Sequence, residues 1–300
     1  MRLAITGATG FVGKRLVALA LERGYGINAL TRRPRSGGDG VNWVFGSLEA
    51  PNALASLMRG ADAVIHVAGV VNAADRAGFA VGNIDGTRSV LAAAQQEGVR
   101  RFVHVSSLAA REPSLSNYGW SKASAEGLVE GSDTDWDMVR PPAVYGPGDM
   151  DMLEIFRMAK RGIALLPPGG RMSAIHVDDL ARLLLALADA PATRAILEPD
   201  DGRPGGWSHE AFAQAVGDAV GKRVRPIALP RRMMAIGAWI DGLVRKGGAR
   251  LTPDRVSYMC HPDWVSDPRR AAPPALWRPE IPTPEGLAQT AAWYRAERLL

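Results

Sequence analysis

The chain has 300 residues, of which 47% are hydrophobic and 22% are charged, a composition typical of a soluble globular protein. Its one cysteine, Cys260, excludes an internal disulfide framework and a metal site built from several thiolates, as is usual in a reducing cytoplasm. The 36 basic residues are scattered among 31 acidic ones, so the formal charge of +5 favours a mixed solvated surface over a nucleic-acid-binding stripe.

The first residues, Met1 to Gly7, have the pattern of a strand that begins at once, without the basic and then apolar stretch of a secretory signal. The longest apolar stretches, such as Leu183 to Leu187, fall well short of the ~20 residues that span a bilayer. We therefore expect a cytoplasmic protein.

From residue 1 to about residue 190, short β-branched runs alternate with longer helical patterns, which predicts βαβ units around a parallel sheet. The predicted strands are Arg2–Thr6, Ile27–Leu30, Trp43–Phe45, Ala63–Val67, Phe102–Ser106 and Asp137–Val139. The predicted helices between them are Gly10–Arg23, Pro51–Arg59, Ile84–Glu97 and Tyr118–Glu130. The fold class is therefore α/β, with a doubly wound parallel sheet.

Beyond Gly146, prolines and glycines punctuate the chain and the regular alternation stops. We predict a dinucleotide-binding domain over residues 1–146, to which residues 173–200 return as a helix and a strand. Residues 147–172 and 201–300 are expected to form a smaller, interleaved substrate-binding region.

The segment Thr6 to Gly13 lies where the first strand ends and the first helix begins, and its three glycines have the spacing Gly-x-x-Gly-x-x-Gly. Such a turn presents backbone N–H groups and the positive end of a helix dipole to a pyrophosphate. Glycine suits it because a Cβ would obstruct the turn or the approach of the phosphate. The expected cofactor contacts here are Gly7, Thr9, Gly10, Phe11, Val12 and Gly13.

The end of the second strand predicts which dinucleotide binds. An acidic residue at this place bonds the ribose diol of NAD, whereas an arginine receives the 2′-phosphate of NADP. Here Thr31 stands at that position and Arg32 and Arg33 follow it. Because guanidinium groups fork onto phosphate oxygens, the sequence favours NADP over NAD.

Tyr118 and Lys122 are four residues apart, so they share one face of the predicted helix. A phenol titrates near ~10, but a neighbouring cation stabilises its phenolate and makes it a usable acid or base. Ser106 and Ser107 end the fifth strand at the carboxyl edge of the sheet, where ligands of such folds bind. A serine there can bond a substrate oxygen whose charge changes.

Five segments together resemble the extended short-chain dehydrogenase/reductase superfamily, which includes nucleotide-sugar epimerases and dehydratases, hydroxysteroid dehydrogenases and flavonoid-type ketone reductases. They are Thr6–Gly13, His66–Gly69, Asn83–Thr87, Arg140–Gly148 and His176–Ala181, in the family's order. The resemblance covers most of residues 1–185 and the rest more loosely, and it implies a Rossmann fold.

The resemblance also implies roles for single residues. Tyr118 would be the catalytic acid or base, Lys122 would hold the nicotinamide ribose, and Ser107 would orient the substrate oxygen, with Ser106 as the fallback. The remaining cofactor contacts that it implies are Val67, Ala68, Gly69, Asn83, Ser106, Tyr118, Lys122, Pro141, Ala143 and Val144, and no metal is expected. The chain departs from the family in the ten residues between Ser107 and Tyr118, a shorter loop than typical sugar epimerases have.

The sequence indicates less about the substrate than about the cofactor. Arg161 and Arg171 could meet an anionic group such as a diphosphate. A stripe of apolar residues at helical spacing has two possible roles: one wall of a site for a bulky hydrophobic alcohol or ketone, or a helix face buried in the core. The stripe comprises Met233, Met234, Ile236, Trp239, Ile240, Leu243 and Val244. A third interpretation is that the stripe contacts an anionic membrane, because basic residues flank it. These basic residues are Arg231, Arg232, Arg245, Lys246 and Arg250. Asp241 interrupts the stripe, which disfavours this interpretation.

The leading hypothesis is an NADP(H)-dependent oxidoreductase acting on a secondary alcohol or ketone of a small organic molecule. The alternatives are a nucleotide-sugar epimerase or dehydratase with tightly bound NAD, and a dinucleotide-binding assembly or regulatory protein without catalysis. The intact serine, tyrosine and lysine favour an enzyme. We expect a small-molecule substrate and no nucleic acid, and a homodimer is compatible with the sequence.

Overall fold

The computed structural model describes residues 1–35, 40–245 and 251–300. Within them the chain forms two compact units. Unit 1 comprises Met1–Pro141, Leu180–Glu198 and Ala272–Arg278, and unit 2 comprises Pro142–Asp179, Pro199–Ala271 and Pro279–Leu300.

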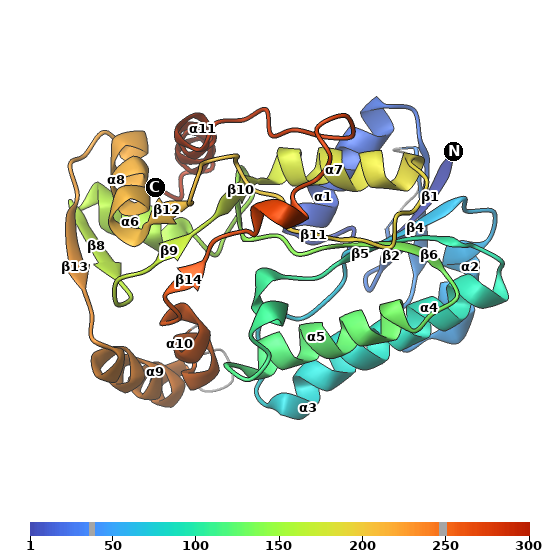
Figure 1. The fold of residues 1–300 in the computed structure, drawn as a ribbon, viewed down its shortest axis with the longest axis horizontal. Helices are drawn as coiled ribbons and strands as arrows, with labels where there is room; N and C mark the ends of the chain where they lie inside the picture. Colours follow the sequence, from blue (N-terminus) through green and yellow to red (C-terminus); the bar gives the residue numbers. More distant parts are fainter. Residues whose placement is uncertain (36–39, 246–250) are drawn as a thin grey trace. The chain divides into compact units, whose positions relative to one another are not determined.

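A seven-stranded sheet forms the centre of unit 1 (Figure 1). Its strands are β1 (Arg2–Thr6), β2 (Gly26–Thr31), β3 (Val41–Phe45), β4 (Ala63–His66), β5 (Arg101–Val105), β6 (Asp135–Val139) and β11 (Ile196–Leu197). All neighbouring pairs are parallel, in the order β11-β6-β5-β4-β1-β2-β3. The order reverses between β1 and β4, and ligands of open α/β sheets bind at the carboxyl ends of strands beside such a reversal.

Helices cover both faces of this sheet. They are α1 (Phe11–Glu22), α2 (Pro51–Met58), α3 (Arg76–Phe79), α4 (Gly86–Gln96), α5 (Asn117–Glu130) and α7 (Val177–Asp189). In Figure 1, α1 and α7 lie on one face, and α2, α4 and α5 lie on the other. The side chains between the sheet and this second layer form one continuous core, which includes Leu57, Val90, Phe102 and Val129.

The predicted α/β class and the predicted order of elements are confirmed, and the six predicted strands all form with shifts of one or two residues at their ends. The main difference precedes α4, which was expected to begin at Ile84. Here the helical path already starts with α3, because the Asp75 carboxylate accepts a hydrogen bond from the Gly78 N–H and caps that helix. A π-helical turn, Ala80–Asp85, then joins α3 to α4.

Unit 2 contains smaller sheets and five helices among its described residues. Its strands are β7 (Ala143–Tyr145), β8 (Ile163–Leu166), β9 (Arg171–Met172), β10 (Ala174–His176), β12 (Trp207–Ser208), β13 (Arg225–Ala228) and β14 (Asp263–Trp264). Its helices are α6 (Leu153–Lys160), α8 (His209–Val220), α9 (Arg231–Arg245), α10 (Pro253–Met259) and α11 (Thr283–Ala296). Its core includes aromatic side chains, among which Phe156 packs edge-on against Tyr294 with ring centroids 5.1 Å apart.

The apolar stripe of α9 is not a buried core face, contrary to one of the sequence-based interpretations. Of its seven residues only Met234 is buried, at 6% exposure. The other six are between 49% and 75% exposed. No helix in the described part of the chain is long and apolar enough to cross a membrane.

Candidate active site

The glycine turn after β1 is tight and leaves no room for side chains. Gly7 has a φ of +71°, which favours glycine, and a Cβ on it would lie 2.6 Å from the Ala68 nitrogen. A Cβ on Gly13 would lie 2.0 Å from the Gly7 carbonyl oxygen. Gly10 precedes α1 without a side-chain cap, so the turn presents the helix N-terminus as a ready anion site.

A chain of buried hydrogen bonds joins this turn to β4 and α4. Thr87 Oγ1 donates to the Asn83 carbonyl oxygen at 2.6 Å, so it accepts from His66 Nε2 at 3.1 Å. His66 Nδ1 then accepts from Thr6 Oγ1 at 2.6 Å, and Thr6 Oγ1 accepts from the Ala68 N–H at 3.2 Å. These bonds assign the neutral Nε2–H tautomer to His66. None of Thr6, His66 and Thr87 is among the site residues predicted from the sequence.

Two buried histidines lie behind the site. Burial, assisted by the positive charge of Lys122, lowers the pKa of His66 to about 3. His104 stacks on His66 with ring centroids 5.3 Å apart, and burial holds its pKa well below the ordinary value of 6.5. Both rings are therefore neutral at pH 7.

Asn83 connects the segment after β4 with helix α5. Its Oδ1 accepts from the Val70 N–H at 2.7 Å, and its Nδ2 donates to the Val70 carbonyl oxygen at 3.0 Å and to Ser121 Oγ at 2.8 Å. Ser121 Oγ in turn donates to the Tyr118 carbonyl oxygen. Asn83, predicted as a cofactor contact, therefore uses both amide N–H groups on the protein and positions the residues around it.

Lys122 is buried at the carboxyl edge of the sheet. Its Nζ donates to the Val105 carbonyl oxygen at 2.7 Å. Burial lowers the pKa of Lys122 to about 8, and the carboxylate of Glu126, one turn along α5, opposes this shift. A Cβ on Gly69 would lie 3.8 Å from this Nζ, so the glycine keeps the space beside the ammonium group narrow but open.

Tyr118 lies in the first turn of α5 and is partly exposed. The Ser116 side chain caps the helix by accepting from the Gly119 N–H at 2.9 Å, which fixes the start of the helix. The Tyr118 ring is tilted against Phe79, with centroids 6.1 Å apart. Tyr118 is therefore one helical turn before the buried Lys122 on α5.

The two serines after β5 have different surroundings. Ser106 is buried, and its hydroxyl donates to the Glu126 carboxylate. Glu126 also accepts two hydrogen bonds from Arg140, and Arg140 and Arg111 both pair with the buried Glu198. Ser106 thus belongs to a buried ion network.

Ser107 is only partly buried and caps the short 3₁₀ turn Leu108–Arg111, accepting from the Ala109 N–H at 3.2 Å. Its O–H is therefore free to donate to a ligand, since this bond uses the oxygen as an acceptor.

The end of β2 carries exposed guanidinium groups. Thr31 is buried, and its hydroxyl donates to the Arg33 carbonyl oxygen at 2.8 Å. Arg32 and Arg33 are exposed directly after it. The guanidinium group of Arg35, which the sequence analysis missed, lies 4.7 Å from the ring centroid of Trp43. The sequence feature that could have identified Arg35 is the run Arg-Arg-Pro-Arg, in which it follows the arginine pair as a third cation.

The structure therefore gathers most predicted site residues at one edge of unit 1, after β1, β4 and β5. Val67, Ala68 and Gly69 follow β4 there and are at least partly exposed, and Pro141 accepts a hydrogen bond from the Leu108 N–H at 3.1 Å. Ala143 and Val144 belong to β7 of unit 2, where they pair with β10. Arg171 uses its guanidinium group on the carbonyl oxygens of Gly205 and Gly206.

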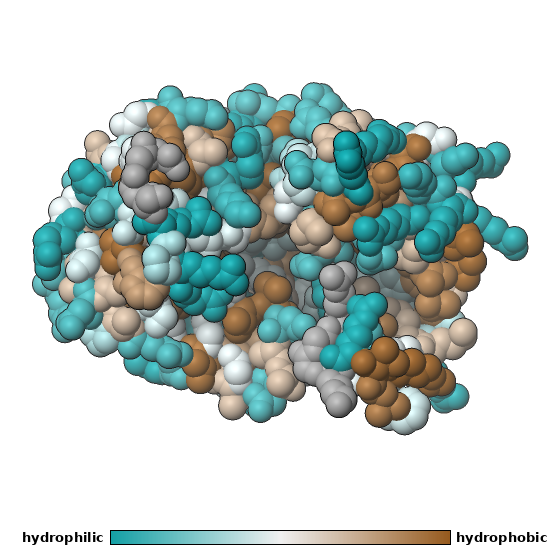
Figure 2. Space-filling model, turned by 180° about the vertical axis from the view of Figure 1, so that it is seen from behind, coloured by the Kyte–Doolittle hydropathy of each residue, from teal (hydrophilic) through white to brown (hydrophobic). Residues whose placement is uncertain are grey.

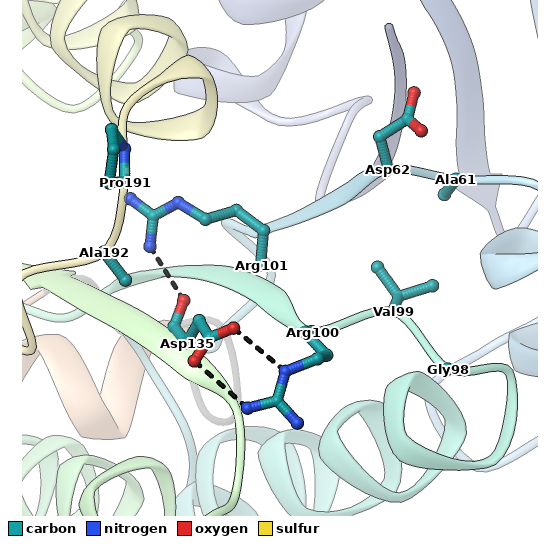
Figure 3. Close-up of a pocket in the computed structure, with 9 residues that line it drawn as sticks. All are labelled: Ala61, Asp62, Gly98, Val99, Arg100, Arg101, Asp135, Pro191 and Ala192. Carbon is teal, nitrogen blue, oxygen red and sulfur yellow. Dashed lines mark hydrogen bonds and ion pairs between the residues drawn. The ribbon is translucent and has the colours of Figure 1, made fainter.

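A cavity of about 660 Å³ lies at the opposite edge of the same sheet (Figure 3). Arg100, Arg101 and Asp135 line it at the amino ends of β5 and β6. Arg100 pairs with the Asp135 carboxylate at 3.0 Å, and Arg101 donates to the Asp135 carbonyl oxygen at 2.8 Å. Both arginines that line the cavity, Arg100 and Arg101, are bound to Asp135, and none of the predicted site residues lines the cavity.

The residues of unit 1 fit a nicotinamide dinucleotide. The glycine turn and uncapped α1 suit a pyrophosphate, and the side-chain-free Gly69 leaves space beside the Lys122 cation. Such a cofactor supplies a carbon that gives or takes hydride. The described residues contain no cluster of three or more histidines, cysteines or carboxylates that could hold a metal ion.

Comparisons with known proteins identify the family to which the chain belongs. The sequence model of the NAD dependent epimerase/dehydratase family matches residues 3–197. The chain is 37% identical to a ceramide reductase of Caulobacter vibrioides, over 98% of this chain and 94% of that protein.

Solved structures also resemble it. One is the human epimerase family protein SDR39U1 with NADPH, at a TM-score of 0.76 and 21% identity, covering 97% of this chain and 99% of the other. Another is MoeE5 in complex with UDP-glucose and NAD, at a TM-score of 0.74 and 23% identity, covering 99% of both chains. With its Rossmann sheet, its glycine turn and these matches, the chain belongs to the NAD dependent epimerase/dehydratase family, within the extended short-chain dehydrogenases/reductases.

Proposed function

We propose that this protein is an NADP(H)-dependent reductase that transfers hydride between the nicotinamide and the carbon of a ketone or secondary alcohol. The observation that carries the proposal is the buried Lys122, held by the Val105 carbonyl oxygen one helical turn beyond Tyr118. A buried cation beside a phenol has a clear use in proton transfer, and a protein that only binds a dinucleotide does not need it.

In the reducing direction, Tyr118 donates its phenolic proton to the carbonyl oxygen of the substrate. Lys122 stabilises the phenolate that remains. Ser107, whose hydroxyl hydrogen is available, donates a hydrogen bond to the same oxygen as negative charge develops on it. In the oxidising direction Tyr118 accepts the proton of the alcohol.

NADP is proposed over NAD because Thr31 ends β2 and residues 32–35, the described residues directly after it, include no carboxylate. The Thr31 hydroxyl bonds the Arg33 carbonyl oxygen there, and the exposed Arg32 and Arg33 would receive a 2′-phosphate. Arg35 adds a third cation nearby in the sequence. The backbone of residues 7–13 would hold the pyrophosphate, and Lys122 would hold the nicotinamide ribose.

The substrate class is proposed from the ceramide reductase relative, which the chain matches along nearly its whole length. A tyrosine proton donor suits a ketone, whose reduction leaves a secondary hydroxyl like those of ceramides. We therefore propose a ketone form of a ceramide or a similar long-chain lipid as substrate.

The test combines nucleotide content with turnover. Purified protein is analysed for bound NAD and NADP before and after dialysis, and NADPH oxidation is then followed with a ketone-containing ceramide. We expect exchangeable NADPH, turnover with wild type, and a loss of 10²-fold or more in kcat for Tyr118→Phe, a typical contribution of a general acid.

Tyr25→Phe makes the same chemical change within unit 1, directly before the amino end of β2, and is the matched control. Stoichiometric NAD that survives dialysis would contradict the proposal and favour an epimerase or dehydratase. Full activity of Tyr118→Phe would contradict the proposed roles.

A further inference from the structure

Helix α9 has two different faces. Positions 234, 238, 241 and 245 follow one another at spacings of three or four residues, so they share one side of the helix. On this side Met234 and Ala238 are buried against Val256 of α10. Positions 233, 236, 240 and 243 share the other side, and Trp239 and Val244 widen it.

The outer side is both apolar and exposed. Met233 is 56% exposed, Ile236 59%, Trp239 66%, Ile240 49%, Leu243 60% and Val244 75%. Figure 2 shows hydrophobic side chains gathered over this helix, at the lower right. A contiguous exposed patch of this kind marks an interaction surface, whereas single exposed hydrophobic residues are ordinary.

Asp241 does not interrupt this outer side, contrary to the sequence-based expectation. Its carboxylate accepts a hydrogen bond from the Leu251 N–H at 2.9 Å and pairs with Arg245 at 3.2 Å, on the side that faces α10. The apolar outer side is therefore free of acidic groups.

The charge around α9 is concentrated, although the whole sequence looks mixed. Residues 219–250 contain eight lysines and arginines and one acidic residue, a net charge of +7, so the remaining 268 residues together carry −2. Arg223, Arg225, Arg231 and Arg232 are all exposed on β13 and α9 or directly before them. Lys246 and Arg250 belong to the same run but lie outside the described residues.

We propose that the outer side of α9 binds the surface of an anionic lipid bilayer, with the helix lying in the plane of the interface. Its apolar residues would enter the boundary between headgroups and acyl chains, and the arginines at its start would reach lipid phosphates. With 15 residues, the helix is about 22 Å long at 1.5 Å per residue, which suits lying on a bilayer rather than crossing it. Trp239 is of the residue type that concentrates at membrane interfaces.

A bilayer fits this surface better than a second copy of the chain. Apposing two α9 helices would bring two segments of +7 together, and like charges across an interface oppose association. An anionic lipid surface instead attracts every cation in the segment.

The experiment is sedimentation of the purified full-length protein with vesicles of phosphatidylcholine and phosphatidylglycerol, and with vesicles of phosphatidylcholine alone. It needs no turnover, so its result does not depend on the proposed reductase activity. We expect binding to the anionic vesicles that weakens with added salt, and little binding to the neutral ones.

Two variants and two controls test the two parts of the surface. Ile236→Ser with Leu243→Ser should abolish binding, whereas Met150→Ser, which changes an exposed methionine outside α9, should not. Arg231→Gln with Arg232→Gln should weaken partitioning about thirtyfold, since each cation near an anionic surface contributes roughly a factor of five. Arg23→Gln with Arg59→Gln removes the same charge from exposed positions in unit 1 and should have a small effect.

Wild type that stays in solution with anionic vesicles would overturn the proposal. Binding of the Ile236→Ser, Leu243→Ser variant to anionic vesicles would also overturn the proposal. If wild type fails to bind vesicles but forms an oligomer that this variant dissociates in size-exclusion chromatography, the surface is an interface between copies of the chain.

Discussion

The Ser106 hydroxyl donates a hydrogen bond to the Glu126 carboxylate, twenty residues along the chain. Glu126 is at the same time bound twice by Arg140. One of two adjacent serines is thus tied into a buried ion network, while Ser107 is left at the edge of the sheet. This contrast gives a direct test of which serine acts on the substrate.

Ser107→Ala should lower kcat by about 10²-fold, the typical effect of losing one hydrogen-bond donor to a developing oxyanion, and should cost about 1 kcal/mol of stability through the loss of its capping bond to Ala109. Ser106→Ala should act mainly on stability. It should retain activity but lose about 1–3 kcal/mol of stability, because Glu126 loses a buried donor. Steady-state kinetics and urea unfolding of both variants check this, and a reversed pattern would assign the catalytic role to Ser106.

Arg32→Ala with Arg33→Ala should weaken NADPH binding by at least about ten- to a hundredfold, because the loss of even one charged hydrogen bond to phosphate costs about 1.5–3 kcal/mol. The affinity for NADH, which lacks the 2′-phosphate, should barely change. Calorimetric titration with both nucleotides measures the two affinities, and Arg59→Ala serves as a charge control. Equal losses for NADPH and NADH would contradict a 2′-phosphate contact.

Lys122 should make stability depend on pH in the alkaline range. Its pKa is lowered by burial from 10.5 to about 8. Below pH 8 the ammonium group is charged in both the folded and the unfolded chain, so the cost of desolvating it reduces stability fully. Between pH 8 and 10.5 the folded chain loses this proton while the unfolded chain keeps it. The destabilising effect of Lys122 therefore decreases as the pH rises. Relative to Lys122→Met, wild type should gain up to about 3 kcal/mol over this range, measured by urea unfolding. A constant difference between the two would show that Lys122 keeps its ordinary pKa.

His104 should make the protein sensitive to acid. Burial holds its pKa well below 6.5, and neither ring nitrogen has a hydrogen-bond partner among the described residues. As the pH falls below 6.5, His104 binds a proton in the unfolded chain but stays neutral in the folded chain, so the free energy of unfolding decreases. His104→Phe should reduce the slope of stability against pH by up to about 1.4 kcal/mol per pH unit, in unfolding experiments between neutral and mildly acidic pH. Parallel curves for the two proteins would contradict this.

The sequence predicted the central sheet well because its cues are local. The strands of unit 1 are short runs rich in apolar residues, and the glycine turn after β1 lies where a strand changes to a helix and no side chain fits at Gly7 or Gly13. The positions of Tyr118 and Lys122 on one helix face followed from helical spacing alone.

Long-range contacts could not be predicted in this way. His66 resembles any buried strand residue in the sequence, and only the fold brings Thr6 and Thr87 to its two ring nitrogens. The α9 stripe shows the same limit, since a helical period reveals that one side is apolar but not whether protein covers it. The division into cofactor-binding and substrate-binding regions stays a prediction.

The hydrogen bonds of Asn83 have a mechanical consequence. One amide group holds the backbone of Val70 on one side and Ser121 on the other, and Ser121 bonds the residue that carries the phenol. A ligand that displaces the segment after β4 would therefore also displace the first turn of α5. In the proposed site, Asn83 would couple cofactor binding to the position of the Tyr118 phenol, so lengthening its side chain by one methylene, in Asn83→Gln, should disturb both together.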